Sequence, residues 1–171
     1  MPHGYIFFVK NDDRSYISKH LMINKLSFKT SFGWISAEEN NNKIISISFG
    51  RIKEIGSSKE LKKLKKILNN YFLGKNKKLQ SNILMKGTKL QIKIWKELQK
   101  IPYGQTKSYG DIAKKIKTSP RYVGNVCGQN KHLLLVPCHR VVRSDGQLGG
   151  FSGLGGLKLK QRLLKLENSL T

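Results

Sequence analysis

The chain has 171 residues and 19.5 kDa, with 33 Lys and Arg against 10 Asp and Glu, which gives a formal net charge of +23. This length suits one ordinary domain or two small ones, and 38% hydrophobic residues can furnish real cores. Because no apolar run approaches the ~20 residues that cross a bilayer, and no positive segment precedes the first apolar patch, we expect no membrane span and no secretory signal.

The first half predicts a β-hairpin. Residues 31–37 carry aromatics and Ile, and three consecutive Asn at residues 40–42 signal a turn. Apolar and polar residues then alternate strictly, with Ile45, Ile47 and Phe49 on one face. We expect these three side chains to point into the core.

The residues after the hairpin predict one amphipathic helix. Ser57 and Glu60 have the spacing of a capping box, and apolar residues at helical spacing follow over residues 61–72, opposite a face of lysines. Residues 75–86 are polar and lysine-rich without a clear period. We therefore place a domain boundary near residue 85, which divides the chain into 1–85 and 86–171.

The second half predicts three helices in succession. Apolar residues have helical spacing over residues 90–101, and Ser108 can cap a short helix over 108–117. Ser119 as N-cap and Pro120 at the first helical position begin the next helix. Two helices joined by a three-residue turn have the plan of a helix-turn-helix.

The last of these helices is unusual because one face has almost no side-chain bulk. Gly124, Asn125 and Gly128 share this face, at a cost of roughly 1 kcal/mol of helix propensity per glycine. Two explanations remain open. The face either packs tightly against a neighbouring element, or it is thin enough to enter the minor groove of DNA with Arg121 at the leading end.

The excess charge is spread over the whole chain. Residues 1–85 hold 16 basic and 6 acidic side chains, and residues 86–171 hold 17 and 4. Since 27 of the 33 basic residues are lysines, which attract phosphate without reading base edges, binding to a polyanion would have little sequence preference. A solubilising surface and an anionic membrane surface are the alternatives.

A cysteine beside basic groups carries the chemistry. Residues 133–136 predict a buried strand that leads directly into Cys138, His139 and Arg140. Nearby positive charge lowers the pKa of a thiol, so we expect Cys138 to be poised to ionise. His139 could take the proton, directly or through a water, and Glu167 on the last helix is a candidate to orient it.

Other interpretations of the cysteines are weaker. A buried cysteine is usually inert, but Cys138 precedes a loop with five glycines in residues 149–156 that can bend closely around a ligand. Cys127, His132, Cys138 and His139 lack the paired spacing of a zinc site. Because the chain has only two cysteines, we expect reduced thiols in an intracellular protein. We also expect no metal and no cofactor.

The hexapeptide over residues 137–142, Pro-Cys-His-Arg-Val-Val, resembles the active-site signature of the O6-alkylguanine-DNA alkyltransferases (methylated-DNA–protein-cysteine methyltransferases). The resemblance covers residues 87–167 closely, and residues 32–34 and 45–50 more loosely. The further matching segments, in the family's order, are Gly87-Thr88, Leu90-Gln91, Ile94-Trp95, Ile101 to Gly104, Ser108-Tyr109, Arg121, Val123-Gly124, Asn130 and Gly149 to Gly153.

The resemblance implies a catalytic role for four residues. Cys138 would accept an alkyl group from O6 of a damaged guanine, in a reaction that each molecule performs once. His139 would deprotonate the thiol through a water, with Glu167 behind it, and Asn130 would brace the turn that holds the site.

The resemblance also implies a DNA-binding and a base-binding set. Arg121 would fill the space left by the extruded guanine, on a helix whose face of Gly124, Asn125 and Gly128 approaches DNA. Tyr109 would crowd the adjacent phosphate and contact the base. The backbone of Cys138, Val141 and Ser152 would meet the purine edge, and Phe151 would cover the base.

The chain departs from the family pattern in three places. Phe151 stands where many members have Tyr, which keeps stacking but removes a hydroxyl. Two residues near Leu154 are additional relative to shorter members, which makes the register of Glu167 less secure. Residues 1–85 contain no cysteine, so the zinc site of some members has no counterpart.

The expected fold is α+β, with a small N-terminal α/β domain that the resemblance makes ribonuclease-H-like, and a helical winged-helix domain with the active site. The expected function is DNA repair by irreversible, stoichiometric transfer of the alkyl group from O6-alkylguanine in double-stranded DNA to Cys138.

We expect the protein to be a monomer that lies in the cytoplasm, or in the nucleus of a eukaryote. Activity on O4-alkylthymine and cooperative loading on DNA are open. The alternatives are a non-catalytic alkylated-DNA-binding relative, a helix-turn-helix regulator and a cysteine hydrolase.

Overall fold

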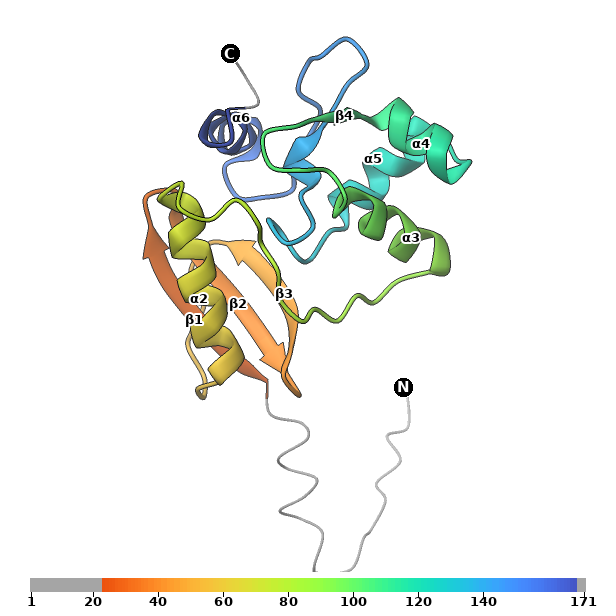
Figure 1. Ribbon diagram of the computed structural model, residues 1–171. Helices are drawn as coiled ribbons and strands as arrows, with labels where there is room; N and C mark the ends of the chain where they lie inside the picture. The colour runs from red at the N-terminus through yellow and green to blue at the C-terminus, as the bar shows by residue number, and fades with distance from the viewer. Residues whose placement is uncertain (1–22, 169–171) are drawn as a thin grey trace, which may run out of the picture.

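The computed structural model describes residues 23–168 as a mixed α+β protein (Figure 1). Its first half is an antiparallel sheet of three strands in the order β1-β2-β3, which span Asn24–Thr30, Gly33–Asn40 and Lys43–Phe49. The predicted hairpin is therefore confirmed as β2 and β3, although residues 31–32 form the preceding turn rather than strand. No helix within residues 23–168 is long and apolar enough to span a membrane.

A β-bulge changes which residues of β3 face the core. The pairing shifts register between Glu38 and Glu39, whose partners are Ser46 and Ile44. Ile45 is the extra residue and stays half-buried, while Ile44 is fully buried. The expected inward position of Ile45 was therefore wrong, because strict alternation assumes that no residue is inserted in the ladder.

Helix α2, Lys59–Phe72, packs against the sheet with its apolar face. Its N-cap is Ser58 rather than the expected Ser57, and the Ser58 hydroxyl accepts from the amides of Glu60 and Leu61. Both serines offer the same side chain, and the sequence pattern misses the boundary by one residue. The buried face consists of Leu61, Leu64, Leu68, Tyr71 and Phe72.

The two halves of the chain share backbone hydrogen bonds and one continuous apolar core. The amide of Ile47 donates to the carbonyl of Lys131 at 2.7 Å, and the amide of Leu133 donates to the carbonyl of Ile47 at 3.3 Å. Buried side chains of α2 and the sheet belong to the same core cluster as those of the second half. The first half is thus built directly against the segment that leads to Cys138.

The three predicted helices of the second half are confirmed. They are α3 (Lys89–Leu98), α4 (Tyr109–Ile116) and α5 (Pro120–Gly128). Ser108 and Asp111 form a capping box at the start of α4, and Ser119 caps α5. Since these boundaries depend on local capping chemistry, the sequence indicates them well.

Residues 133–136 are not the buried strand that we expected. They form a turn with isolated bridges, in which Leu134 has φ of 74°. A short 3₁₀ helix η1, Cys138–Arg140, follows, and then β5 (Val141–Val142), which pairs in parallel with β4 (Lys107–Ser108). The last helix, α6, spans Gly156–Leu166 and has Glu167 as its C-cap.

Candidate active site

A pocket of about 480 Å³ lies between the start of α4, helix α5, η1 and the glycine-rich loop. Cys138 lines it with only 3% of its surface exposed. The pocket thus brings Tyr109, Gly124, Gly128, Phe151 and Ser152 of the predicted site together with the thiol. The full lining is Tyr109, Pro120, Gly124, Cys127, Gly128, Cys138, Gly149, Gly150, Phe151 and Ser152.

A buried ion-pair network lies behind the thiol. Nε2 of His139 lies 2.9 Å from Oε1 of Glu167, and the Arg140 guanidinium donates through Nε to Oε2 at 2.8 Å and through Nη2 to Oε1 at 2.9 Å. Burial raises the pKa of Glu167, but the hydrogen bonds and charges of His139 and Arg140 outweigh it and lower the pKa to about 2. Glu167 is therefore an ionised carboxylate.

The protonation state of His139 follows from this partner. Burial lowers the pKa of His139 and outweighs the opposing effect of Glu167, so the imidazole is neutral at rest. An ionised carboxylate can only accept, so the single ring proton is on Nε2. Nδ1 is buried and has no hydrogen-bond partner among residues 23–168. His139 thus has a free acceptor nitrogen that can take a proton.

The thiol of Cys138 is not ionised by its neighbours, contrary to our expectation. Burial raises its pKa, and the hydrogen bond from Asn130 and the charge of Lys160 only partly oppose this. Arg140 does not face the sulfur, because its guanidinium is bound to Glu167 and to the carbonyl of Ile101. The resting thiol keeps its proton and requires a base to become a nucleophile.

Asn130 connects the thiol to the preceding turn. Its Nδ2 donates to the carbonyl of Val136 at 2.8 Å and to Sγ of Cys138 at 3.2 Å. Its Oδ1 accepts from the amide of His132 at 2.8 Å. The Asn130 side chain therefore links the two ends of the turn at residues 133–136, which has no regular strand to hold it in place.

Lys160 is a site residue that the sequence reasoning missed. It is fully buried on α6, and Nζ donates to the carbonyls of Val141 at 2.6 Å and Gly149 at 3.3 Å. It also lies 5.8 Å from the Tyr109 ring centroid. The signal was present in the sequence, since Lys160 interrupts the otherwise apolar face of α6 formed by Leu159, Leu163 and Leu164.

The bare face of α5 is not covered by another element of the described chain. A Cβ atom added at Gly128 would meet no atom within 4 Å, and one at Gly124 would make only ordinary contact with Tyr109. Tight internal packing therefore does not explain these glycines. Arg121 and Asn125 are exposed on the same helix.

In the glycine-rich loop, two glycines permit close approach to aromatic rings. A Cβ atom at Gly149 would lie 2.5 Å from the Tyr109 hydroxyl oxygen, and one at Gly153 would lie 2.5 Å from a Phe151 ring carbon. These rings define the walls of the pocket. Val141, by contrast, is buried in β5 and is not among the lining residues, and its carbonyl is occupied by Lys160.

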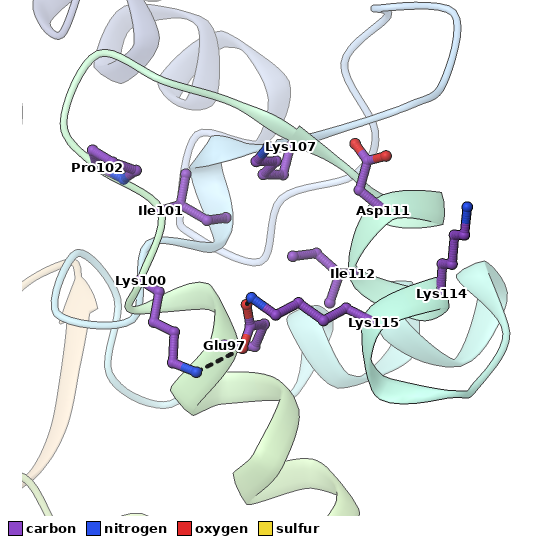
Figure 2. Close-up of a pocket in the computed structure, with 9 residues that line it drawn as sticks. All are labelled: Glu97, Lys100, Ile101, Pro102, Lys107, Asp111, Ile112, Lys114 and Lys115. Carbon is purple, nitrogen blue, oxygen red and sulfur yellow. Dashed lines mark hydrogen bonds and ion pairs between the residues drawn. The ribbon is translucent and has the colours of Figure 1, made fainter.

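A second pocket, of about 470 Å³, lies between α3 and α4 and contains no such chemistry (Figure 2). Its carboxylate, Glu97, pairs with Lys100 at 2.9 Å and with Lys115 at 2.5 Å. No cysteine, serine or histidine lines this pocket. Within residues 23–168, no group of three or more His, Cys, Asp or Glu is placed to hold a metal ion.

Comparison with known proteins identifies a family model and relatives that match the chain. Residues 89–169 match the family model described as "6-O-methylguanine DNA methyltransferase, DNA binding domain". A methylated-DNA–protein-cysteine methyltransferase of Metallosphaera sedula is 37% identical over 152 residues, which cover 87% of this chain and 96% of that protein. One of Mycobacterium tuberculosis is 42% identical over 104 residues, which cover 60% of this chain and 62% of that protein.

Solved structures resemble the chain over most of its length. The crystal structure of Mycobacterium tuberculosis OGT in complex with DNA has a TM-score of 0.76 and 31% identity, covering 85% of this chain and 92% of that chain. The O6-methylguanine-DNA methyltransferase of Pyrococcus kodakaraensis has a TM-score of 0.65 at 23% identity, over 85% and 99% of the two chains, and shares the fold.

Proposed function

The chain belongs to the methylated-DNA–protein-cysteine methyltransferase family, and from this membership we propose that Cys138 is the cysteine that receives the alkyl group from O6-alkylguanine. The protein binds DNA and repairs it by alkyl transfer. The observation that carries the proposal is the position of Cys138 in the pocket, with the buried pair of His139 and Glu167 behind it.

The proposed step balances without a cofactor. The sulfur of Cys138 attacks the alkyl carbon, the S–C bond forms, and the C–O6 bond breaks with its electron pair left on guanine. The thiol proton passes through a water to Nδ1 of His139, and the Glu167 carboxylate stabilises the imidazolium that results. The product is a thioether, which thiol exchange cannot reverse, so each molecule reacts once.

DNA binding in this proposal uses the bare face of α5. The absence of side-chain bulk at Gly124 and Gly128 lets this helix enter the minor groove. Asn125, on the same face of the helix, enters the groove with them. Extruding the guanine costs a few kcal/mol, and Arg121 reduces this cost by filling the vacated space. Tyr109 and Phe151 contact the extruded base, and Ser152 meets its edge through its backbone. The Val141 carbonyl, which already accepts from Lys160, meets the same edge through its second lone pair. The excess of lysines neutralises phosphates.

The finer fold and context are part of the same proposal. The antiparallel sheet with α2 corresponds to a ribonuclease-H-like domain over residues 1–85. The pair α4 and α5, with β4 and β5 beside it, corresponds to a winged-helix domain over residues 86–171. The protein would act as a monomer on double-stranded DNA, in the cytoplasm or in the nucleus of a eukaryote.

The test measures where the methyl group goes when the protein is incubated with a duplex that contains O6-methylguanine with a radiolabelled methyl group. One methyl group per protein molecule should appear on the peptide that contains Cys138, and Cys138→Ser should abolish the transfer. Cys127→Ala, the matched variant at the second cysteine of the pocket, should still take up label. Label that stays on DNA would indicate a non-catalytic binding protein, and repeated turnover would indicate a hydrolase.

A further inference from the structure

The carboxylate of Glu167 receives one side-chain hydrogen bond from the first half of the chain. The hydroxyl of Tyr71, on α2, lies 2.6 Å from Oε1, although the two residues are 96 positions apart. The other side-chain donors, His139 and Arg140, come from η1 beside the pocket. Among the described residues, the first half of the chain therefore contacts the Glu167 carboxylate through one side-chain hydrogen bond.

The direction of this hydrogen bond is fixed by the environment. Tyr71 is fully buried, and burial, followed by the negative charge of Glu167, raises its pKa well above the ordinary value. The hydroxyl therefore keeps its proton at every physiological pH and donates it to the ionised carboxylate. A short O–H···O⁻ bond between buried groups is among the stronger hydrogen bonds in proteins.

The oxygen that Tyr71 contacts is the one that faces His139. Oε1 accepts from the Tyr71 hydroxyl at 2.6 Å and lies 2.9 Å from Nε2 of His139. Glu167 is the C-cap of α6, beyond the last helical turn, so side-chain partners rather than the helix determine where the carboxylate lies. Arg140 holds one edge of the carboxylate, and Tyr71 approaches from α2.

The simpler explanation is that a buried tyrosine needs any acceptor for its hydroxyl. Tyr103 is an example of that case. Its ring lies edge-on to the Tyr71 ring with 6.1 Å between the centroids, and its hydroxyl donates to the backbone carbonyl of Leu166 at 2.8 Å. Tyr103 is thus satisfied without touching the carboxylate. The two tyrosines are therefore a matched pair. Removal of either hydroxyl deletes a hydrogen bond of a buried tyrosine, but only the Tyr71 hydroxyl contacts Glu167.

We propose that Tyr71 is a positioning residue for alkyl transfer, whose hydroxyl holds Oε1 of Glu167 in the place where it keeps His139 with its proton on Nε2 and its Nδ1 lone pair free. This inference rests on the proposed function and deepens it. It gives the first half of the chain a part in the chemistry, in addition to support of the fold.

The first test compares Tyr71→Phe with Tyr103→Phe in single-turnover transfer from a duplex containing O6-methylguanine. Tyr71→Phe should slow the first-order transfer step by about tenfold, because Oε1 loses a charge-assisted donor. Its affinity for the duplex should stay within about twofold of wild type, since α2, the helix that carries Tyr71, lies well apart from α5 (Figure 1). Tyr103→Phe should transfer at the wild-type rate.

A double-mutant cycle then asks whether Tyr71 acts through Glu167. In the Glu167→Gln background, Tyr71→Phe should slow transfer no further, because the carboxylate that it positions is gone. A role in packing alone would give the same fold-loss in both backgrounds. Equal losses, or a wild-type rate for Tyr71→Phe, would overturn the proposal.

A measurement on the unsubstituted chain covers the case in which Tyr71→Phe does not fold. The Tyr71 hydroxyl proton and the His139 Nε2 proton share one acceptor, so both should give slowly exchanging downfield proton resonances with a mutual nuclear Overhauser effect. Absence of that effect would overturn the inference. Failure of the proposed function is distinguishable, because wild-type protein would then transfer no methyl group at all.

Discussion

The ammonium of Lys160 donates to the carbonyl oxygen of Val141 at 2.6 Å, which places a fully buried positive charge against the strand that follows the Cys138 thiol. Among residues 23–168, Lys160 forms no ion pair with a carboxylate. Burial lowers the pKa of Lys160, and the negative charge that Cys138 carries as a thiolate opposes this only in part; two backbone carbonyls accept hydrogen bonds from the ammonium. Such a group is costly to bury, and its charge would favour the thiolate that the proposed reaction forms.

Replacement of Lys160 by Met should slow alkyl transfer at neutral pH. Burial raises the pKa of Cys138 and the charge of Lys160 opposes this, so removal of the charge should raise the pKa further. The rising limb of the pH–rate profile should then move to higher pH, by about tenfold in rate at neutrality for each unit of displacement. Single-turnover rates between pH 6 and about 10 check this.

The matched control for this charge is Lys158→Met, which removes an exposed lysine from the same helix. It should leave the profile in place, because an exposed charge is screened by water and salt. A Lys160→Met profile that coincides with wild type would show that the buried ammonium has only a structural role.

The ionised state of Glu167 should make the folded protein sensitive to acid. Its pKa falls from the ordinary 4.5 to about 2, through hydrogen bonds and charges that outweigh burial. A carboxyl group with a lowered folded-state pKa contributes stability above the unfolded pKa, and this contribution of roughly 3 kcal/mol is lost as pH falls toward 2. Urea unfolding from pH 7 down to pH 2 measures it.

The variant Glu167→Gln isolates the contribution of this one carboxylate. It should be less stable than wild type at pH 7, because Arg140 and His139 lose their charged partner in a buried site. The difference between the two proteins should narrow steadily below about pH 4.5. A difference that is constant with pH would contradict the assignment.

The sequence was sufficient at several positions where local chemistry decides the structure. Capping at Ser108 and Ser119 marks the starts of α4 and α5, and the hexapeptide around Cys138 indicates the family. It was insufficient where a distant residue decides. The bulge that buries Ile44 in place of Ile45 depends on strand pairing, and the turn at residues 133–136 depends on the side chain of Asn130.

The state of the site residues depended even more on tertiary contacts. Proximity along the chain predicted that Arg140 would face the thiol, but a carboxylate from α6 holds the guanidinium instead. Tyr71 reads as an ordinary member of an amphipathic helix until the fold places it beside Glu167. Lys160 interrupts an apolar helix face in the sequence, but only the fold shows that its partner is the carbonyl of Val141. The roles of the site residues remain predictions that the proposed experiments test.

The close contact between Gly149 and Tyr109 predicts a sensitive position in the loop. Gly149→Ala should slow transfer from duplex DNA by about tenfold or more, because the new Cβ atom would lie 2.5 Å from the Tyr109 hydroxyl oxygen and displace the ring. The neighbouring Gly150→Ala should lose much less, since its Cβ atom meets nothing within 4 Å. Equal losses for both variants would show that loop flexibility, rather than the Tyr109 contact, matters.

The exposed position of Arg121 at the start of α5 predicts a loss that depends on the substrate. Arg121→Ala should weaken repair of O6-methylguanine in duplex DNA by about 10- to 100-fold, because nothing then fills the space of the extruded base. Transfer from the free alkylated base should change far less, since no base has to be extruded. Arg51→Ala, which removes an equal charge from the first half, controls for the general attraction to phosphate. Equal losses on both substrates would contradict the proposed role of Arg121 in filling the vacated space, and would indicate that Arg121 acts on the base-binding pocket instead.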